Sequence, residues 1–300
     1  MVRAVGRWMI RGSLAFALLC LAVLIWLRSA GGSEWMRVQI LAAIEPQMTR
    51  GKVTLEGVKT DLLRSFELMG IEFHDGSTRV VRVDTMAVTV DPWTVLSGRI
   101  GVSSLVVDGL TADLLTDESG KVNLGALFEG SDAPAPPAGP YQGIGVNLSF
   151  DAIDVSATSL TIDGTGIGAV RINAAVDIEG STVAIRDLRA VGTMGEPVDG
   201  VVSLDGNATL RGGDLRLEEV RLSDGANQIG FSGSIMQVET DPVMDLSVHL
   251  VALDPAGIEL LVGEPLLSET ISGVIGVTGT TTAVKAEGQL SGESQDGSLA

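Results

Sequence analysis

Cysteine, histidine and aromatic residues are scarce in this 300-residue chain, and the shortages exclude several classes of protein. The one cysteine, Cys20, can form neither an intramolecular disulfide nor a Cys-x-x-Cys metal site, and we interpret it as an apolar filler. The two histidines, His74 and His249, lie far apart in the sequence without partners at metal-ligand spacing. The sequence contains neither a phosphate-binding loop nor a nucleophile elbow. It therefore predicts a protein that is not an enzyme, with no cofactor and no metal.

Basic residues are also few, and they are unevenly distributed. Residues 1–52 have a net charge of +5, whereas the rest of the chain has a net charge of −23. Such an acidic body repels nucleic acid, so we expect no nucleic-acid partner. The basic end is predicted to lie beside a membrane.

A long apolar run, Leu14–Leu27, follows the basic N-terminal residues. Spanning a bilayer takes ~20 helical residues, and residues 8–13 extend the run to that length if Arg11 snorkels. The predicted membrane contacts are Leu14, Leu18, Leu21, Leu24 and Trp26. The residues predicted to keep the N-terminus cytoplasmic are Arg3, Arg7 and Arg11. A cleaved signal peptide ending near residues 29–31 is the alternative, and either reading exports the body of the protein.

Residues 33–45 are predicted to form one amphipathic helix, with Ser33 as N-cap and Pro46 as stop. This helix would lie at the membrane surface, or would cover the first end of a β-structure. Three short helical turns are predicted at residues 91–96, 123–128 and 254–257.

After Lys52, apolar residues recur at every second position, which is typical of half-buried strands. Gly-containing dipeptides occur about every ten residues and predict hairpin turns, among them Asp108-Gly109 and Asp205-Gly206. The chain is therefore predicted to be all-β after its N-terminal transmembrane helix, as a long antiparallel meander. The candidate residues for its apolar face are Ile172, Val176, Ile178, Leu215, Leu217, Phe231, Ile235, Leu246 and Val248.

Composition divides the chain into six segments. They are a cytoplasmic stub and anchor (1–32), a juxtamembrane helix (33–50), an N-terminal β module (51–130), a Pro-rich linker (131–140), a repetitive β segment (141–290) and a polar tail (291–300).

The order of several motifs resembles the AsmA-like superfamily, which includes TamB. The motifs follow the predicted anchor and helix at residues 51–58, 66–73, 88–100, 102–128 and 233–255. The resemblance implies a bacterial inner-membrane protein that crosses the membrane once, with its N-terminus in the cytoplasm and its bulk in the periplasm. It also implies an elongated sheet curled into an open groove with its apolar face inside. About twenty strands would make that groove on the order of 100 Å long.

Three functions remain open on the sequence. The first is non-enzymatic guidance of phospholipid from the inner towards the outer membrane along the apolar groove, with membrane lipids as partners. The second is a role in the assembly or secretion of outer-membrane proteins, with an Omp85/TamA-type outer-membrane partner. The third is a closed β-scaffold or interaction protein whose apolar faces pack together.

Overall fold

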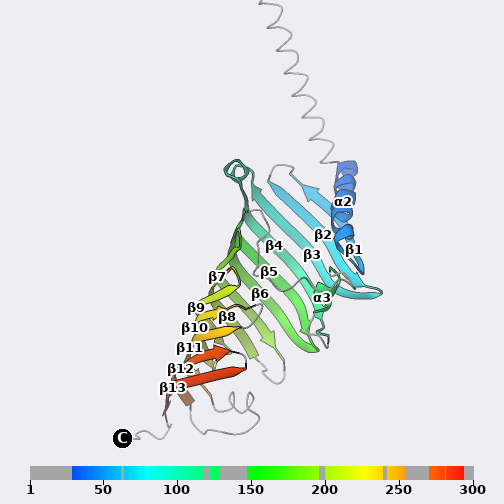
Figure 1. Ribbon diagram of the computed structural model, residues 1–300. Helices are drawn as coiled ribbons and strands as arrows, with labels where there is room; N and C mark the ends of the chain where they lie inside the picture. The colour runs from blue at the N-terminus through cyan, green and yellow to red at the C-terminus, as the bar shows by residue number, and fades with distance from the viewer. Residues whose placement is uncertain are drawn as a thin grey trace, which may run out of the picture.

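The computed structural model of the chain describes residues 29–61, 64–117, 122–128, 147–195, 200–238, 242–254, 270–280 and 282–293. These residues form one open sheet of thirteen strands and a few short helices (Figure 1), so the predicted β-rich fold class is confirmed. The helices are α2 (Ala30–Ile44), α3 (Asn123–Ala126) and the 3₁₀ helices η1 (Glu45–Gln47) and η2 (Thr94–Ser97). The strands are β1 (Lys52–Thr60), β2 (Ser65–Asp75), β3 (Thr78–Asp91), β4 (Arg99–Leu114), β5 (Asn147–Ile162), β6 (Thr165–Glu179), β7 (Thr182–Met194), β8 (Gly200–Arg211), β9 (Asp214–Ser223), β10 (Gln228–Met236), β11 (Val243–Leu253), β12 (Thr270–Thr280) and β13 (Ala283–Glu293).

The strands follow one another across the sheet in chain order. All neighbouring pairs are antiparallel except β4–β5, which is parallel, so the prediction of a purely antiparallel meander was wrong at this pair. A parallel pair requires a long connection that brings the chain back to the end where the previous strand began. Residues 115–146, which include the predicted linker 131–140, form that connection.

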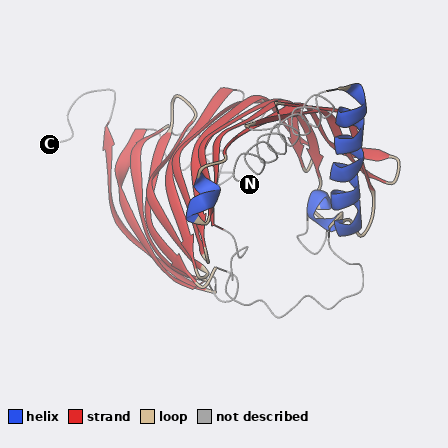
Figure 2. Cartoon of the chain, turned by 90° about the horizontal axis from the view of Figure 1, so that it is seen from above, coloured by secondary structure: helices blue, strands red, loops and turns tan. Residues whose placement is uncertain are grey.

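The sheet curves strongly (Figure 2), and β-bulges explain the curvature. Every neighbouring pair except β1–β2 and β12–β13 contains a register shift. An extra residue on one strand bends that strand and increases its twist. Asp108-Gly109 and Asp205-Gly206 were predicted as hairpin turns, but they lie inside β4 and β8. Gly109 and Gly206 have positive φ angles (68° and 146°), and each lies at a register shift, in the β4–β5 and β8–β9 pairs respectively.

The sequence predicted about twenty strands. Turn signals that lie inside strands, such as those at Gly109 and Gly206, contribute to the difference from the number observed. The described residues form thirteen strands of 9 to 16 residues. At the usual spacing, thirteen strands span ~60 Å across the sheet.

Helix α2 begins earlier than predicted. Its N-cap is Ser29 rather than Ser33, because the Ser29 hydroxyl accepts a hydrogen bond from the Gly32 N–H (3.4 Å). The α-helix ends at Ile44, and Pro46 lies in the 3₁₀ turn η1 that follows. Side chains of α2 pack on the buried residues of the first strands, namely Met36, Ile40, Leu41 and Ile44. The helix therefore covers the first end of the sheet, one of the two roles left open by the sequence.

The tightly packed core lies under α2 and α3. Its buried members come from β1 to β4, namely Val53, Leu55, Val58, Ile71, Val80, Val81, Val83, Val107 and Ala112. Leu127 is fully buried beside them, and its carbonyl accepts a hydrogen bond from the Thr49 N–H (2.8 Å), which joins α3 to the α2–β1 connection. Beyond Leu127, the described residues include only four buried hydrophobic side chains, Ala157, Val170, Leu253 and Ile271.

Two of the three predicted helical turns are present, as η2 and α3. Residues 255–257 of the third, the linker 131–140 and the predicted anchor Leu14–Leu27 with its three arginines lie outside the described residues. Among the residues that the structure does describe, no helix has the length and hydrophobicity needed to cross a membrane.

Candidate functional site: the uncovered apolar face

One face of the sheet is apolar from the first strand to the last. Side chains on paired residues of neighbouring strands point to the same side, so the register traces rows across the sheet. The central row contains one residue from each strand: Val58, Leu68, Met86, Val107, Val155, Ile172, Ala190, Leu204, Leu222, Ile229, Leu250, Gly273 and Leu290. No member of this row is polar.

The nine residues that the sequence predicted for the apolar face all lie on this side of the sheet. Strand β6 contributes Ile172, Val176 and Ile178, which alternate along the strand. The remaining six lie on β9, β10 and β11, where the register places them on the same face, namely Leu215, Leu217, Phe231, Ile235, Leu246 and Val248. All nine side chains are half-buried. Whether any of them contacts a ligand stays a prediction.

Sequence reasoning missed about as many residues of the same face. They include Leu148, Phe150, Val183, Ile185, Leu204, Leu210, Ile275 and Val277. Bulges hid part of them, because an extra residue reverses which positions face inward. In β5 the apolar face passes from Phe150 to Ile153, and in β9 it passes from Leu217 to Val220. A search for apolar runs offset by one bulge residue would have found these continuations.

The exposure of this face differs along the chain. In the central row Val58 is 3% exposed beneath α2, Leu222 is 37% exposed and Leu290 is 56% exposed. Among the described residues, the helices that pack on the face are α2 and the α3 segment, and both pack at β1–β4. From β5 to β13, the described residues supply no second layer. This part of the apolar face, from β5 to β13, is the candidate site.

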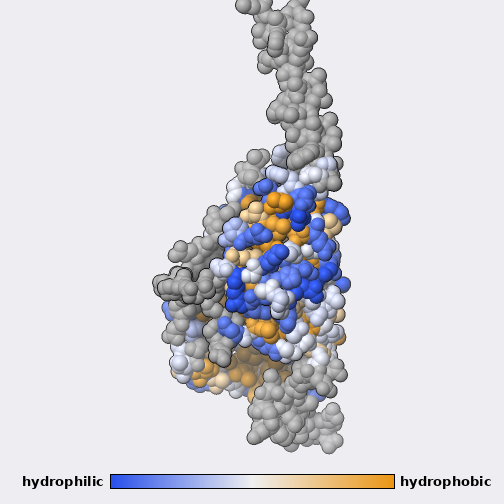
Figure 3. All heavy atoms as spheres, turned by 90° about the vertical axis from the view of Figure 1, so that its right-hand side faces the viewer, coloured by the Kyte–Doolittle hydropathy of each residue, from blue (hydrophilic) through white to orange (hydrophobic). Residues whose placement is uncertain are grey.

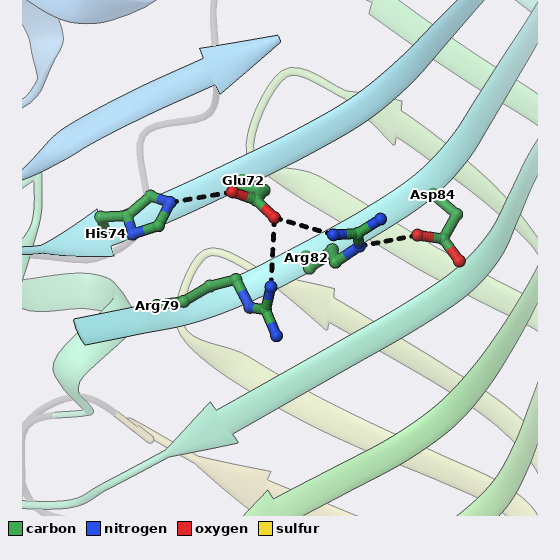
Figure 4. A network of polar contacts seen from close by, with 5 residues as sticks. All are labelled: Glu72, His74, Arg79, Arg82 and Asp84. Atoms are coloured by element: carbon green, nitrogen blue, oxygen red, sulfur yellow. Dashed lines mark hydrogen bonds and ion pairs between the residues drawn. The ribbon is translucent and has the colours of Figure 1, made fainter. Parts of the chain in front are cut away.

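The opposite face is polar and carries exposed ion pairs, such as Lys59–Glu67 on β1–β2 and Arg221–Asp205 on β8–β9. Exposed pairs of this kind contribute little to stability, but they keep that face hydrated. The largest network centres on Glu72 (Figure 4). Its carboxylate accepts hydrogen bonds from His74 Nε2 (3.0 Å), Arg79 (3.2 Å) and Arg82 (3.1 Å).

This network lowers the pKa of the Glu72 carboxyl. The main cause is the hydrogen bond from the His74 ring, and the Arg79 and Arg82 guanidinium groups add to it. Arg82 Nε also donates to Asp84 (2.8 Å), which raises the pKa of Arg82. All these charges have partners within the network. We therefore interpret it as a solvated outer surface of β2–β3 that holds the two strands in register.

The polar side chains of the described residues do not form a catalytic or metal-binding arrangement. Ser247 Oγ lies 3.1 Å from His249 Nε2, but the two residues share one exposed strand. An activated serine also needs a third group that orients the base, and within the described residues no carboxylate bonds to His249. The described residues likewise contain no group of three or more His, Cys, Asp or Glu able to hold a metal ion.

Comparison with known proteins adds no relative. No protein-family model, no curated protein and no solved structure matches this chain. The resemblance to the AsmA-like superfamily therefore stays a prediction. What the fold itself defines is a protein built on one long curved sheet with one polar face and one apolar face, and among the described residues the helices that cover the apolar face lie at its first end.

Proposed function

We propose that the protein is a non-enzymatic envelope protein that guides phospholipid acyl chains along the apolar face of its curved sheet. The observation that carries this proposal is the apolar face from β5 to β13, over which the described residues place no second layer. Leaving such a face in water is costly, because each buried methylene group is worth ~0.8 kcal/mol. An acyl chain laid against the face recovers that free energy for the protein and for the lipid.

The chemistry of the rows favours movement along the sheet over tight binding at one place. An acyl chain that crosses the strands meets the same kind of surface every ~4.8 Å, because each row repeats aliphatic residues. Ile172, Leu204 and Leu250 occupy equivalent positions on β6, β8 and β11. No polar side chain in the row fixes the lipid, so neighbouring positions are close in free energy.

The proposed cellular location of this surface follows from the sequence of residues 1–28. The basic and apolar N-terminal segment predicts a membrane anchor with the sheet outside the cytoplasm. The resemblance to the AsmA-like superfamily implies that this membrane is the bacterial inner membrane and that the sheet lies in the periplasm. An inner-membrane anchor and a sheet of ~60 Å suit passive transfer of phospholipid towards the outer membrane.

The test is photo-crosslinking in cells, with a photoreactive residue placed in turn at four positions of β6. Val176 and Ile178 belong to the apolar face, whereas Asn173 and Asp177 belong to the polar face. We expect lipid adducts at Val176 and Ile178 only. Val58 is the matched control, because it lies on the same face under α2 and should crosslink within the protein. Adducts with protein alone at all apolar positions would mean that the face is closed, and the protein would then be a scaffold.

A second candidate function is assistance in assembling outer-membrane proteins. The observation that favours it is the edge of β13, which within the described residues pairs on one side only, with β12. An exposed edge can add a strand of another protein through main-chain hydrogen bonds. Deleting the gene should then deplete particular outer-membrane proteins, and unchanged levels would refute this role.

A further inference from the structure

Trp93 is the most exposed large hydrophobic side chain that the structure describes, at 69%. It lies in the connection between β3 and β4, just before η2. A tryptophan buries a large apolar area when it has a partner, so this exposed indole is a candidate contact residue.

The turn around Trp93 is built to hold this position. Asp91 Oδ1 accepts a hydrogen bond from the Trp93 N–H (3.0 Å), and the Thr94 hydroxyl donates to the Asp91 carbonyl (2.7 Å). The Gly101 N–H then donates to the Thr94 hydroxyl (2.8 Å), which fixes the turn to the start of β4. The indole is therefore presented by an ordered turn.

This turn lies at the same end of the sheet as the start of α2 (Figure 1). At this end β3 finishes beside the β1–β2 turn, where the Val90 N–H donates a hydrogen bond to the Arg64 carbonyl (2.7 Å). Helix α2 also exposes Trp35 (49%) and Val38 (48%). On the side of the molecule shown in Figure 3, hydrophobic and hydrophilic areas are interspersed. Only Arg28 separates the apolar run Leu14–Leu27 from Ser29, the N-cap of α2.

We propose that the β3–β4 turn contacts the surface of the membrane into which the N-terminal run inserts, with Trp93 at the interface between headgroups and acyl chains. Tryptophan favours that interface because its ring is amphipathic. A lipid surface fits better than a protein partner, because a protein interface needs ~800 Å² on each side and one indole on a short turn supplies far less. The exposed Arg64 beside the turn suits lipid phosphates.

Two attachment points, the N-terminal run and the Trp93 turn, would fix the orientation of the sheet relative to the bilayer. The inference rests on the membrane anchoring in the proposed function, but it does not depend on lipid movement along the apolar face. Failure of this inference can therefore be distinguished from failure of the proposed lipid transfer, because Trp93 can contact the bilayer whether or not Val176 crosslinks to lipid.

The experiment uses the full chain in vesicles of phosphatidylethanolamine and phosphatidylglycerol, with and without phosphatidylcholine brominated on its acyl chains. Replacing Trp8, Trp26 and Trp35 by phenylalanine leaves Trp93 as the only fluorescent indole. The matched control adds Trp93→Phe and Ser77→Trp, which moves the indole to the exposed β2–β3 turn at the opposite end of the sheet. Circular dichroism confirms that both variants keep the same β content.

We expect the Trp93 emission to be blue-shifted and to lose intensity on brominated lipid, while the indole at position 77 is quenched only by aqueous acrylamide. If Trp93 behaves like the indole at position 77, the turn lies in water and the proposal is wrong. If neither bromine nor acrylamide quenches Trp93, the indole is buried against protein, and that result overturns lipid contact in favour of a protein partner.

Discussion

The same substitution at two positions of the central row should have opposite consequences. Val58 and Leu222 both belong to this row, but Val58 is 3% exposed under α2 and Leu222 is 37% exposed on β9. We replace each by aspartate in the full chain. The comparison isolates the effect of the covering layer, because the chemistry of the change and the face of the sheet are the same.

The expected costs follow from burial. Val58→Asp removes a fully buried aliphatic side chain, worth ~1.5–3 kcal/mol, and places a carboxylate without a partner in the core. An unpaired buried charge adds several kcal/mol, so the total is on the order of 5 kcal/mol, comparable with the whole stability of many domains. Leu222→Asp keeps its carboxylate hydrated and loses about 1 kcal/mol of apolar contact.

Two assays read the outcome. Thermal melting by circular dichroism and limited proteolysis report folding, and mass spectrometry of the protein purified without delipidation reports bound phospholipid. Val58→Asp should unfold the β1–β4 end, whereas Leu222→Asp should fold normally and bind less lipid. Val274→Asp is the control, because Val274 is exposed on the polar face, where it pairs with His249 and Gln289 of the neighbouring strands. This substitution should change neither folding nor lipid binding.

The reasoning is refuted if Leu222→Asp unfolds the protein as severely as Val58→Asp. That result would mean that the apolar face beyond β5 is covered in solution, and the protein would then be a closed scaffold. Normal folding of Leu222→Asp with undiminished lipid would instead locate the lipid elsewhere.

Two further predictions test the curvature of the sheet and the outer network. Gly233→Ala should lower the melting temperature strongly, because an added Cβ would lie 2.2 Å from the Asp245 carbonyl oxygen and because Gly233 has a φ of +130°. Gly230→Ala in the same strand should be tolerated, because its Cβ would meet no atom closer than 3.5 Å. Equal melting temperatures of the two variants would contradict the bulge geometry. Because the pKa of Glu72 is lowered on folding, its contribution to stability is present above the unfolded value near 4.5 and is lost as pH falls through the folded value. The melting temperature of Glu72→Gln should therefore fall less steeply than that of the native protein below pH ~4.5, and parallel curves would show that the network does not affect folding.

Much of the fold was predictable because apolar residues alternate along most strands. The run from Ile172 to Ile178 alternates without interruption, and the structure places all its even-numbered residues on one face. The turn at Asp163-Gly164 likewise joins β5 to β6, and Glu179-Gly180 joins β6 to β7. In these places a local pattern and the hydrogen-bonded register require the same backbone, so the sequence alone suffices.

The errors arose where local chemistry has two structural solutions. A glycine with positive φ suits a hairpin turn, but it also suits a bulge inside a strand, and Gly109 and Gly206 take the second role. The orientation of β5 depends on a connection of more than thirty residues, whose composition does not specify the end to which it returns. The extent of the candidate site was underestimated for the same reason, because each bulge shifts the apolar face by one position.

The distribution of cover along the sheet also constrains where lipid would reach the protein. Helix α2 packs on the apolar face of β1–β4, so an acyl chain cannot use that part without displacing Met36 or Ile40. Strand β5 begins at the end of the sheet where α2 starts, because it is parallel to β4 and pairs Asn147 with Arg99. That end also carries Trp93, which we propose to contact the bilayer. A lipid leaving the membrane would therefore meet the uncovered face first at Leu148 and Phe150, and the parallel β4–β5 pair would mark the boundary between the part that anchors the sheet and the part that carries lipid.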